Sequence, residues 1–156
     1  MSSMKFAIGL LLLMNAEVSI SASEPDYNAC AQIYVGVSDA GGKLEAREAR
    51  EFLNAISCDY FSTAEGVQFG MELIVVVLEN SPDEFISAFD QLSPALQGQI
   101  LEAIESPIHD GFDLINIYSR VANSKAASPA KSRILAAVRT AAEGKGLDLN
   151  ERSRTR

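Results

Sequence analysis

The sequence predicts an all-α fold, a small bundle of six or seven short helices built as a single domain. Apolar side chains recur at spacings of three and four residues along most of the chain, which is the period of an amphipathic helix. Four of the five prolines directly follow a serine, at positions 81, 93, 106 and 128, and serine followed by proline is a common way to begin a helix. A chain of 156 residues has room for one sizeable core.

The first 23 residues are expected to be a secretory signal peptide and not part of the domain. Lys5 precedes nine apolar residues, FAIGLLLLM, and the polar, small-residue segment NAEVSISAS follows them. This order is typical of a signal peptide, and the apolar run is too short to span a bilayer. We predict cleavage after Ala22 or Ser23 and export to the periplasm, with no membrane span left after cleavage. An uncleaved N-terminal anchor is the alternative.

The first two expected helices are separated by the turn SDAGG, whose glycines permit positive backbone angles. Asp26 is expected to cap the first helix, and the second helix is expected from about Lys43. Cys30 and Cys58 are the only cysteines, so in an oxidising compartment they predict one disulfide that pins the two helices as a hairpin. Closing a loop of about 29 residues stabilises the fold by roughly 3.5 kcal/mol in the chain-entropy description.

The segment 66–80 carries β-branched residues that would also suit a strand. We interpret it as a buried central helix, because a lone strand is not stable and no partner strand is evident. Ser62 and Glu65 form a predicted capping box at its start.

The Ser-Pro dipeptides predict the starts of later helices. Serine accepts hydrogen bonds from the free amides of a first helical turn, and proline fits the next position. We expect helices to begin at 81–82, 93–94 and 128–129, with a capping box between Ser81 and Glu84 and a helix end at Gly144. A signal for phosphorylation or proline recognition is the alternative interpretation. Ser106-Pro107 differs, because it leads into a loop, after which Asp110 is expected to cap a further helix.

Charge is unevenly distributed. Residues 24–124 carry 17 acidic and 4 basic side chains, a net charge of −13, whereas residues 125–156 carry 3 acidic and 8 basic, a net charge of +5. An acidic body argues against nucleic acid and anionic lipid and favours a basic protein partner. The domain is expected to cover residues 24–143, followed by a basic, disordered tail at 144–156.

No residue pattern indicates an enzyme. His109 is the only histidine, no nucleophile elbow accompanies it, and two thiols with one histidine do not complete a tetrahedral metal site. We therefore expect no catalytic, cofactor-binding or metal-binding residues. The loop that carries His109, Asp110 and Phe112 is the candidate partner contact; a histidine without function in a surface loop is the alternative.

Three features resemble one known family. Cys30, Tyr34, Gly36 and Asp39 lie in an apolar first helix, Cys58 follows, and Glu65-Gly66-Val67 leads a helix rich in leucine and valine that ends at Leu78-Glu79-Asn80-Ser81-Pro82. This order, over about residues 28–90, resembles the resistance-associated-protein/Tai type of periplasmic immunity proteins. The resemblance implies a helical protein that protects bacteria from type VI secretion amidase effectors, which cut peptidoglycan. Cys30, Gly36, Asp39, Cys58, Gly66 and Val67 would then have structural roles.

Two functions follow as hypotheses. The first is an exported periplasmic protein that sterically blocks a basic toxin, a secreted cell-wall amidase, by binding it through an acidic surface or loop. The second is a structural or accessory protein of the cell envelope that acts by self-association, as a homodimer or within a larger complex.

Overall fold

The computed structural model describes residues 27–58, 63–107 and 111–149. Within these ranges the chain forms seven α-helices and no strand, which confirms the all-α prediction. The helices are α1 (Tyr27–Asp39), α2 (Ala46–Ala55), α3 (Ala64–Asn80), α4 (Pro82–Phe89), α5 (Pro94–Glu105), α6 (Leu114–Asn123) and α7 (Pro129–Gly144).

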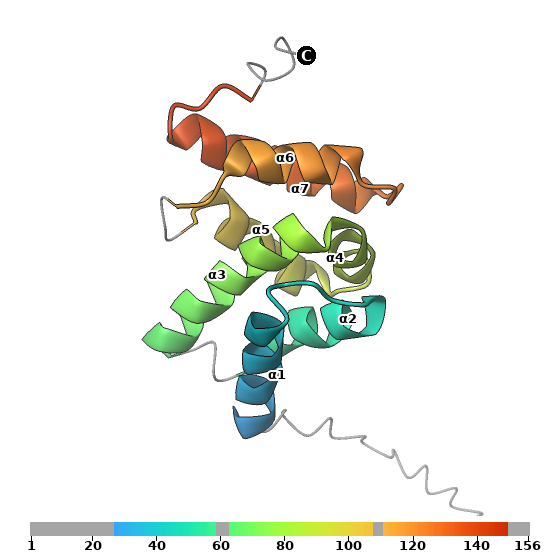
Figure 1. The fold of residues 1–156 in the computed structure, drawn as a ribbon, viewed down its shortest axis with the longest axis vertical. Coiled ribbons are helices and arrows are strands. Elements are labelled where there is room, and N and C mark those ends of the chain that lie inside the picture. The colour runs from blue at the N-terminus through green and yellow to red at the C-terminus, as the bar shows by residue number, and fades with distance from the viewer. Residues whose placement is uncertain (1–26, 59–62, 108–110, 150–156) are drawn as a thin grey trace, which may run out of the picture.

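The helices are arranged around α3, which packs against α1, α4, α5 and α6. Helices α1 and α2 lie at one end of the molecule, and α6 and α7 lie side by side at the other end (Figure 1). Between the two ends, α4 packs against α2, and α5 packs against α7. The two ends of the molecule are therefore joined through the middle helices.

The central position of α3 explains its composition. Its second half is buried through Leu73, Ile74, Val75, Val77 and Leu78, so a helix that is apolar on nearly every side is covered by neighbours on nearly every side. The prediction of a helix over this β-branched segment is confirmed. The hydroxyl of Thr63 caps it by accepting a hydrogen bond from the Gly66 amide at 3.0 Å; the expected cap, Ser62, lies outside the described residues.

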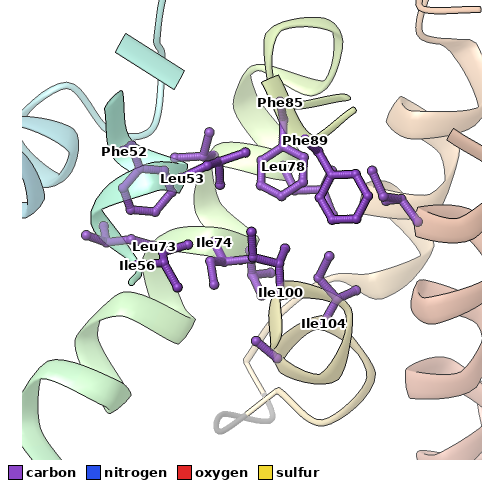
Figure 2. Packing of buried hydrophobic residues seen from close by; sticks show 14 of the residues in the cluster. Phe52, Leu53, Ile56, Leu73, Ile74, Leu78, Phe85, Phe89, Ile100 and Ile104 are labelled. Carbon is purple, nitrogen blue, oxygen red and sulfur yellow. The ribbon is translucent and has the colours of Figure 1, made fainter. Parts of the chain in front are cut away.

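One hydrophobic core runs through the described part of the chain. The largest fully buried side chains come from successive helices and meet at the centre (Figure 2). They include Phe52 and Leu53 from α2, Ile74 and Leu78 from α3, Phe85 and Phe89 from α4, and Ile100 and Ile104 from α5. The rings of Phe85 and Phe89 stack, with centroids 6.3 Å apart.

Three Ser-Pro dipeptides begin helices as predicted, since Pro82, Pro94 and Pro129 are the first residues of α4, α5 and α7. Ser93 accepts a hydrogen bond from the Leu96 amide at 3.3 Å, and Ser128 accepts one from the Ala130 amide at 3.1 Å. Ser106 ends α5, so the fourth dipeptide does not begin a helix.

Ser81 corrects the capping prediction. Its hydroxyl makes no cap to α4, and the expected capping box with Glu84 is absent. Instead the hydroxyl donates to the Gly42 carbonyl at 3.1 Å and accepts from the Leu44 amide at 2.9 Å. Ser81 is only 5% exposed, because the turn between α1 and α2 lies directly on it. This turn has positive φ angles at Gly41 and Gly42, as predicted.

The cap of α6 and the end of the packed domain differ from the sequence prediction. Asp113, not Asp110, caps α6, because its carboxylate accepts a hydrogen bond from the Asn116 amide at 2.9 Å. Helix α7 ends at Gly144 as expected, but the chain then turns at Gly146 (φ 67°), and the partly buried Leu149 packs against the core. The packed part of the chain thus continues past residue 143.

Candidate functional site

The predicted contact loop is described only at its end. His109 and Asp110 lie outside the described residues, so their proposed role stays a prediction. Phe112 is described; it is partly buried and packs against the core. Gly111 is exposed beside it.

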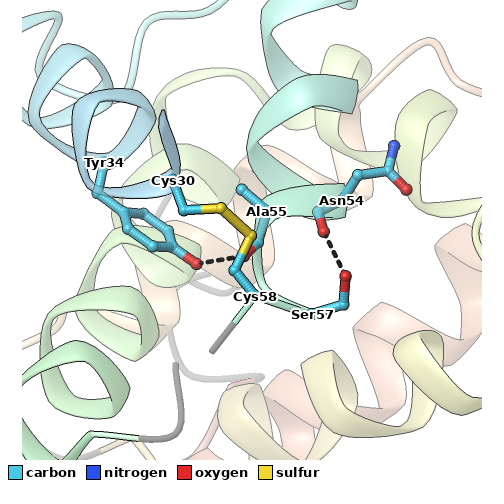
Figure 3. The surroundings of a disulfide bond; sticks show 6 residues. All are labelled: Cys30, Tyr34, Asn54, Ala55, Ser57 and Cys58. Atoms are coloured by element: carbon cyan, nitrogen blue, oxygen red, sulfur yellow. Dashed lines mark hydrogen bonds between the residues drawn. A yellow bond between two sulfur atoms is a disulfide. The ribbon is translucent and has the colours of Figure 1, made fainter. Parts of the chain in front are cut away.

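The predicted disulfide is present between Cys30 and Cys58, with an S–S distance of 2.01 Å. It joins the beginning of α1 to the turn that follows α2 (Figure 3). Next to it, the buried Tyr34 donates a hydrogen bond from its hydroxyl to the Ala55 carbonyl at 3.0 Å, and its ring meets the ring of Phe52 edge-on at 5.8 Å. The disulfide and Tyr34 together fix α1 on α2, which is a structural role.

A cleft of about 540 Å³ lies between α4 and the loop that joins α6 to α7. Helix α4 and the residues just after it supply Asp83, Ile86, Ser87, Asp90 and Gln91, and the loop supplies Lys125, Ala126, Ala127 and Ser128. Ile86 is buried, whereas Ser87, Asp90 and Gln91 are exposed. We call this feature the acidic cleft.

Hydrogen bonds fix the loop side of the acidic cleft. One carboxylate oxygen of Asp83 accepts from the Ala126 amide at 2.9 Å, which ties the loop to the first turn of α4. Lys131 of α7 donates to the Ser124 carbonyl at 2.8 Å, and the hydroxyl of Ser128 caps α7. These hydrogen bonds therefore fix the loop wall of the cleft to α4 on one side and to α7 on the other.

The electrostatics of the acidic cleft favour a cationic group. Asp83 and Asp90 place two carboxylates on the α4 side, against the single ammonium group of Lys125 on the loop. The other acidic residues in the described part of the body add to the negative potential around it. The chemistry of this lining is therefore suited to binding a positively charged side chain.

A second, smaller cleft of about 300 Å³ lies beside the disulfide, between α1 and α2. Its lining is mostly apolar, and its charged residues are Arg50 and Glu51 of α2. The full lining is Ala29, Cys30, Ile33, Arg50, Glu51, Asn54, Ala55 and Cys58. We call it the disulfide cleft.

No protein-family model, curated protein or solved structure matches this chain. Over the described ranges, no three acidic, histidine or cysteine side chains are grouped so that they could hold a metal ion. In the same ranges, no helix has the length and apolar character required to cross a membrane.

Sequence reasoning did not find either cleft. It did not nominate Asp83, Asp90 or Lys125 for a binding site. Asp90 and Lys125 lie 35 positions apart in the chain, and only the packing of α4 near α6 and α7 brings them to one cleft. No local spacing could have indicated this arrangement.

Proposed function

We propose that this protein is exported to the periplasm and binds a basic protein partner there, which it blocks sterically. The proposed partner is a secreted amidase that cuts peptidoglycan. The protein itself would carry out no chemistry. The observation that carries the proposal is the acidic cleft, where the carboxylates of Asp83 and Asp90 line a hollow between two fixed walls.

The charge of the chain supports a basic partner. Described residues 27–58, 63–107 and 111–124 together carry 13 acidic and 4 basic side chains, a net charge of −9, and residues 125–149 carry +3, so the described residues have a net charge of −6. A negative surface of this kind attracts a positive partner over distances of about a Debye length, roughly 8 Å at physiological ionic strength. It also raises the association rate at low salt. A lysine or arginine of the partner would enter the acidic cleft and pair with Asp90.

Export is supported by the leader-like segment at residues 1–23 and by the use of both cysteines in one disulfide. Disulfides persist in oxidising compartments, of which the bacterial periplasm is one. The resemblance of residues 28–90 to periplasmic immunity proteins supports the choice of an amidase as partner. The rigid helical scaffold supports steric inhibition, since preorganised surfaces lose little entropy on binding.

The test first asks whether a gene adjacent to that of this protein encodes a secreted amidase, and then mixes the purified amidase with the exported, oxidised protein. Equimolar protein is expected to stop the amidase from releasing peptides from peptidoglycan. Asp90→Lys is expected to lower the association rate about tenfold at low salt, because it replaces an attractive charge with a repulsive one. The rate is measured by stopped-flow fluorescence over a series of salt concentrations.

Glu102→Lys is the matched control, because it makes the same change of charge at an exposed position on α5 that does not line the cleft. It should slow association less than Asp90→Lys. Full amidase activity in the presence of the protein would refute the proposed function. Equal effects of the two substitutions would refute the acidic cleft as the contact.

A further inference from the structure

The α1–α2 end differs in charge from the rest of the described chain. Residues 27–58 carry four acidic and three basic side chains, a net charge of −1. Residues 63–107 and 111–124 carry nine acidic and one basic, a net charge of −8, and residues 125–149 carry two acidic and five basic, a net charge of +3. A surface that meets an identical copy of itself is repelled by its own net charge. Among these three described stretches, the nearly neutral residues 27–58 of the α1–α2 end therefore meet the least charge repulsion on self-contact.

The disulfide cleft lies at this end and is complementary to itself. Arg50 and Glu51, adjacent in sequence and opposite in charge, line it around an apolar interior. Glu51 pairs with Arg47 at 3.2 Å, and both side chains are more than half exposed. The guanidinium group of Arg50 is also exposed and makes no hydrogen bond or ion pair among the described residues.

We propose that a second copy of this chain covers the disulfide cleft in a symmetric dimer. In a two-fold interface every contact occurs twice, so Arg50 of each copy lies over the cleft of the other copy and its guanidinium group pairs with Glu51 there. The methylene groups of arginine cover apolar surface while the charged end stays hydrated. The planar guanidinium group also matches a carboxylate in two parallel hydrogen bonds. Ala29, which is exposed, and Ile33, which is partly exposed, would supply the apolar surface that is covered.

The pairing can be tested by exchanging charges. The dissociation constant of the exported, oxidised protein is measured by analytical ultracentrifugation over a concentration series. Arg50→Glu places two adjacent carboxylates of one copy against the same pair on the other, so we expect the dissociation constant to rise at least about tenfold. Glu51→Arg places two adjacent guanidinium groups of one copy against the same pair on the other, so we expect a similar rise in the dissociation constant. An equimolar mixture of the two variants is expected to form a mixed dimer, because each acidic pair then meets a basic pair.

Arg120→Glu is the matched control, since it makes the same change of charge at an exposed position on α6. It should leave the dissociation constant within a few-fold of that of the unchanged protein. Circular dichroism of each variant verifies that it is folded. A protein that stays monomeric at all concentrations would overturn the proposal. A dimer that resists Arg50→Glu, or two variants that fail to associate when mixed, would also overturn it. Asp90→Lys should not change the dissociation constant of the dimer. The dimer test and the test of amidase inhibition can therefore fail independently of each other.

Discussion

Ser81 donates a hydrogen bond from its hydroxyl to the Gly42 carbonyl, although the two residues lie 39 positions apart in the chain. The same hydroxyl accepts a hydrogen bond from the Leu44 amide. One side chain thus satisfies two backbone groups of the turn between α1 and α2, at the point where α3 ends and α4 begins. This junction connects the α1–α2 end of the molecule to its central helices.

Ser81→Ala is expected to destabilise the protein by about 1–3 kcal/mol, because it leaves two buried backbone groups without this partner. Urea denaturation followed by circular dichroism gives the change in free energy of unfolding. Ser93→Ala is the control: it removes the side-chain cap of α5 at a solvent-exposed residue, and it should cost about 1 kcal/mol or less. An equal or smaller cost for Ser81→Ala would contradict the importance of the junction.

Gly42→Ala should be more damaging than Gly41→Ala, although both glycines have positive φ angles. A Cβ atom on Gly42 would lie 2.8 Å from the Val76 carbonyl oxygen, whereas a Cβ atom on Gly41 would meet nothing within 4 Å. Gly41→Ala should cost about 1–2 kcal/mol from the backbone angle alone. Gly42→Ala should cost about 3 kcal/mol or more, since the contact with backbone adds to that penalty. Thermal and urea unfolding of the two variants would reveal the difference; equal costs would show that the turn can move away from α3.

Gln97 is expected to be a sensitive polar position of α5. Its side-chain amide donates to the Phe89 and Leu92 carbonyls at 2.9 and 3.3 Å and accepts from Arg133 at 2.6 Å. Gln97→Ala should cost about 1–3 kcal/mol in the free energy of unfolding, because the site is buried and these groups lose a partner. Gln99→Ala, at an exposed position of the same helix, is the control and should change stability by less than about 0.5 kcal/mol.

The coupling of Gln97 to Arg133 can be measured separately. A double-mutant cycle with Arg133→Ala is expected to give an interaction energy of about 0.5–3 kcal/mol. A value near zero would mean that the hydrogen bond between α5 and α7 contributes nothing to stability. The contact of the Arg133 guanidinium group with the Phe89 ring, at 5.6 Å, would then be the more important role of this arginine.

Replacing both cysteines, as Cys30→Ser/Cys58→Ser, should reduce the free energy of unfolding by about 2–5 kcal/mol. The loss of protection from hydrogen exchange should be greatest in α1, because this helix packs mainly on α2 and α3. Alkylation of the unreduced protein is the control and should label neither thiol. Labelled thiols, or a loss of protection spread evenly over all helices, would contradict this account of the disulfide.

The sequence was most informative where a helix is determined by its own residues. Ser93 and Ser128 cap the helices that follow them because the acceptor and the amide lie within three positions of each other. Ser81 has the same local sequence, but its hydroxyl bonds to a distant turn, and only the packing of that turn decides between the two outcomes. The cap of α6 was predicted to be Asp110 but is Asp113. Both are aspartates near the start of this helix, and the local sequence does not decide which of them caps it.

The candidate sites were less predictable. The disulfide could be predicted because only one pairing of two cysteines exists. The acidic cleft depends on Asp83 and Asp90 facing a loop more than thirty positions away, and helical periodicity carries no information on such a pairing. Phe112 was predicted as a surface contact, whereas its side chain is partly buried against the core.

The position of α3 has a consequence for how this protein could change over generations. The two clefts lie on different pairs of elements, and α3 packs against both α1 and α6. Substitutions on the rim of one cleft can accumulate without disturbing the other, so one proposed contact could diverge while the other is preserved. Substitutions within α3 have no such freedom, because they would disturb the helices behind both proposed contact surfaces together.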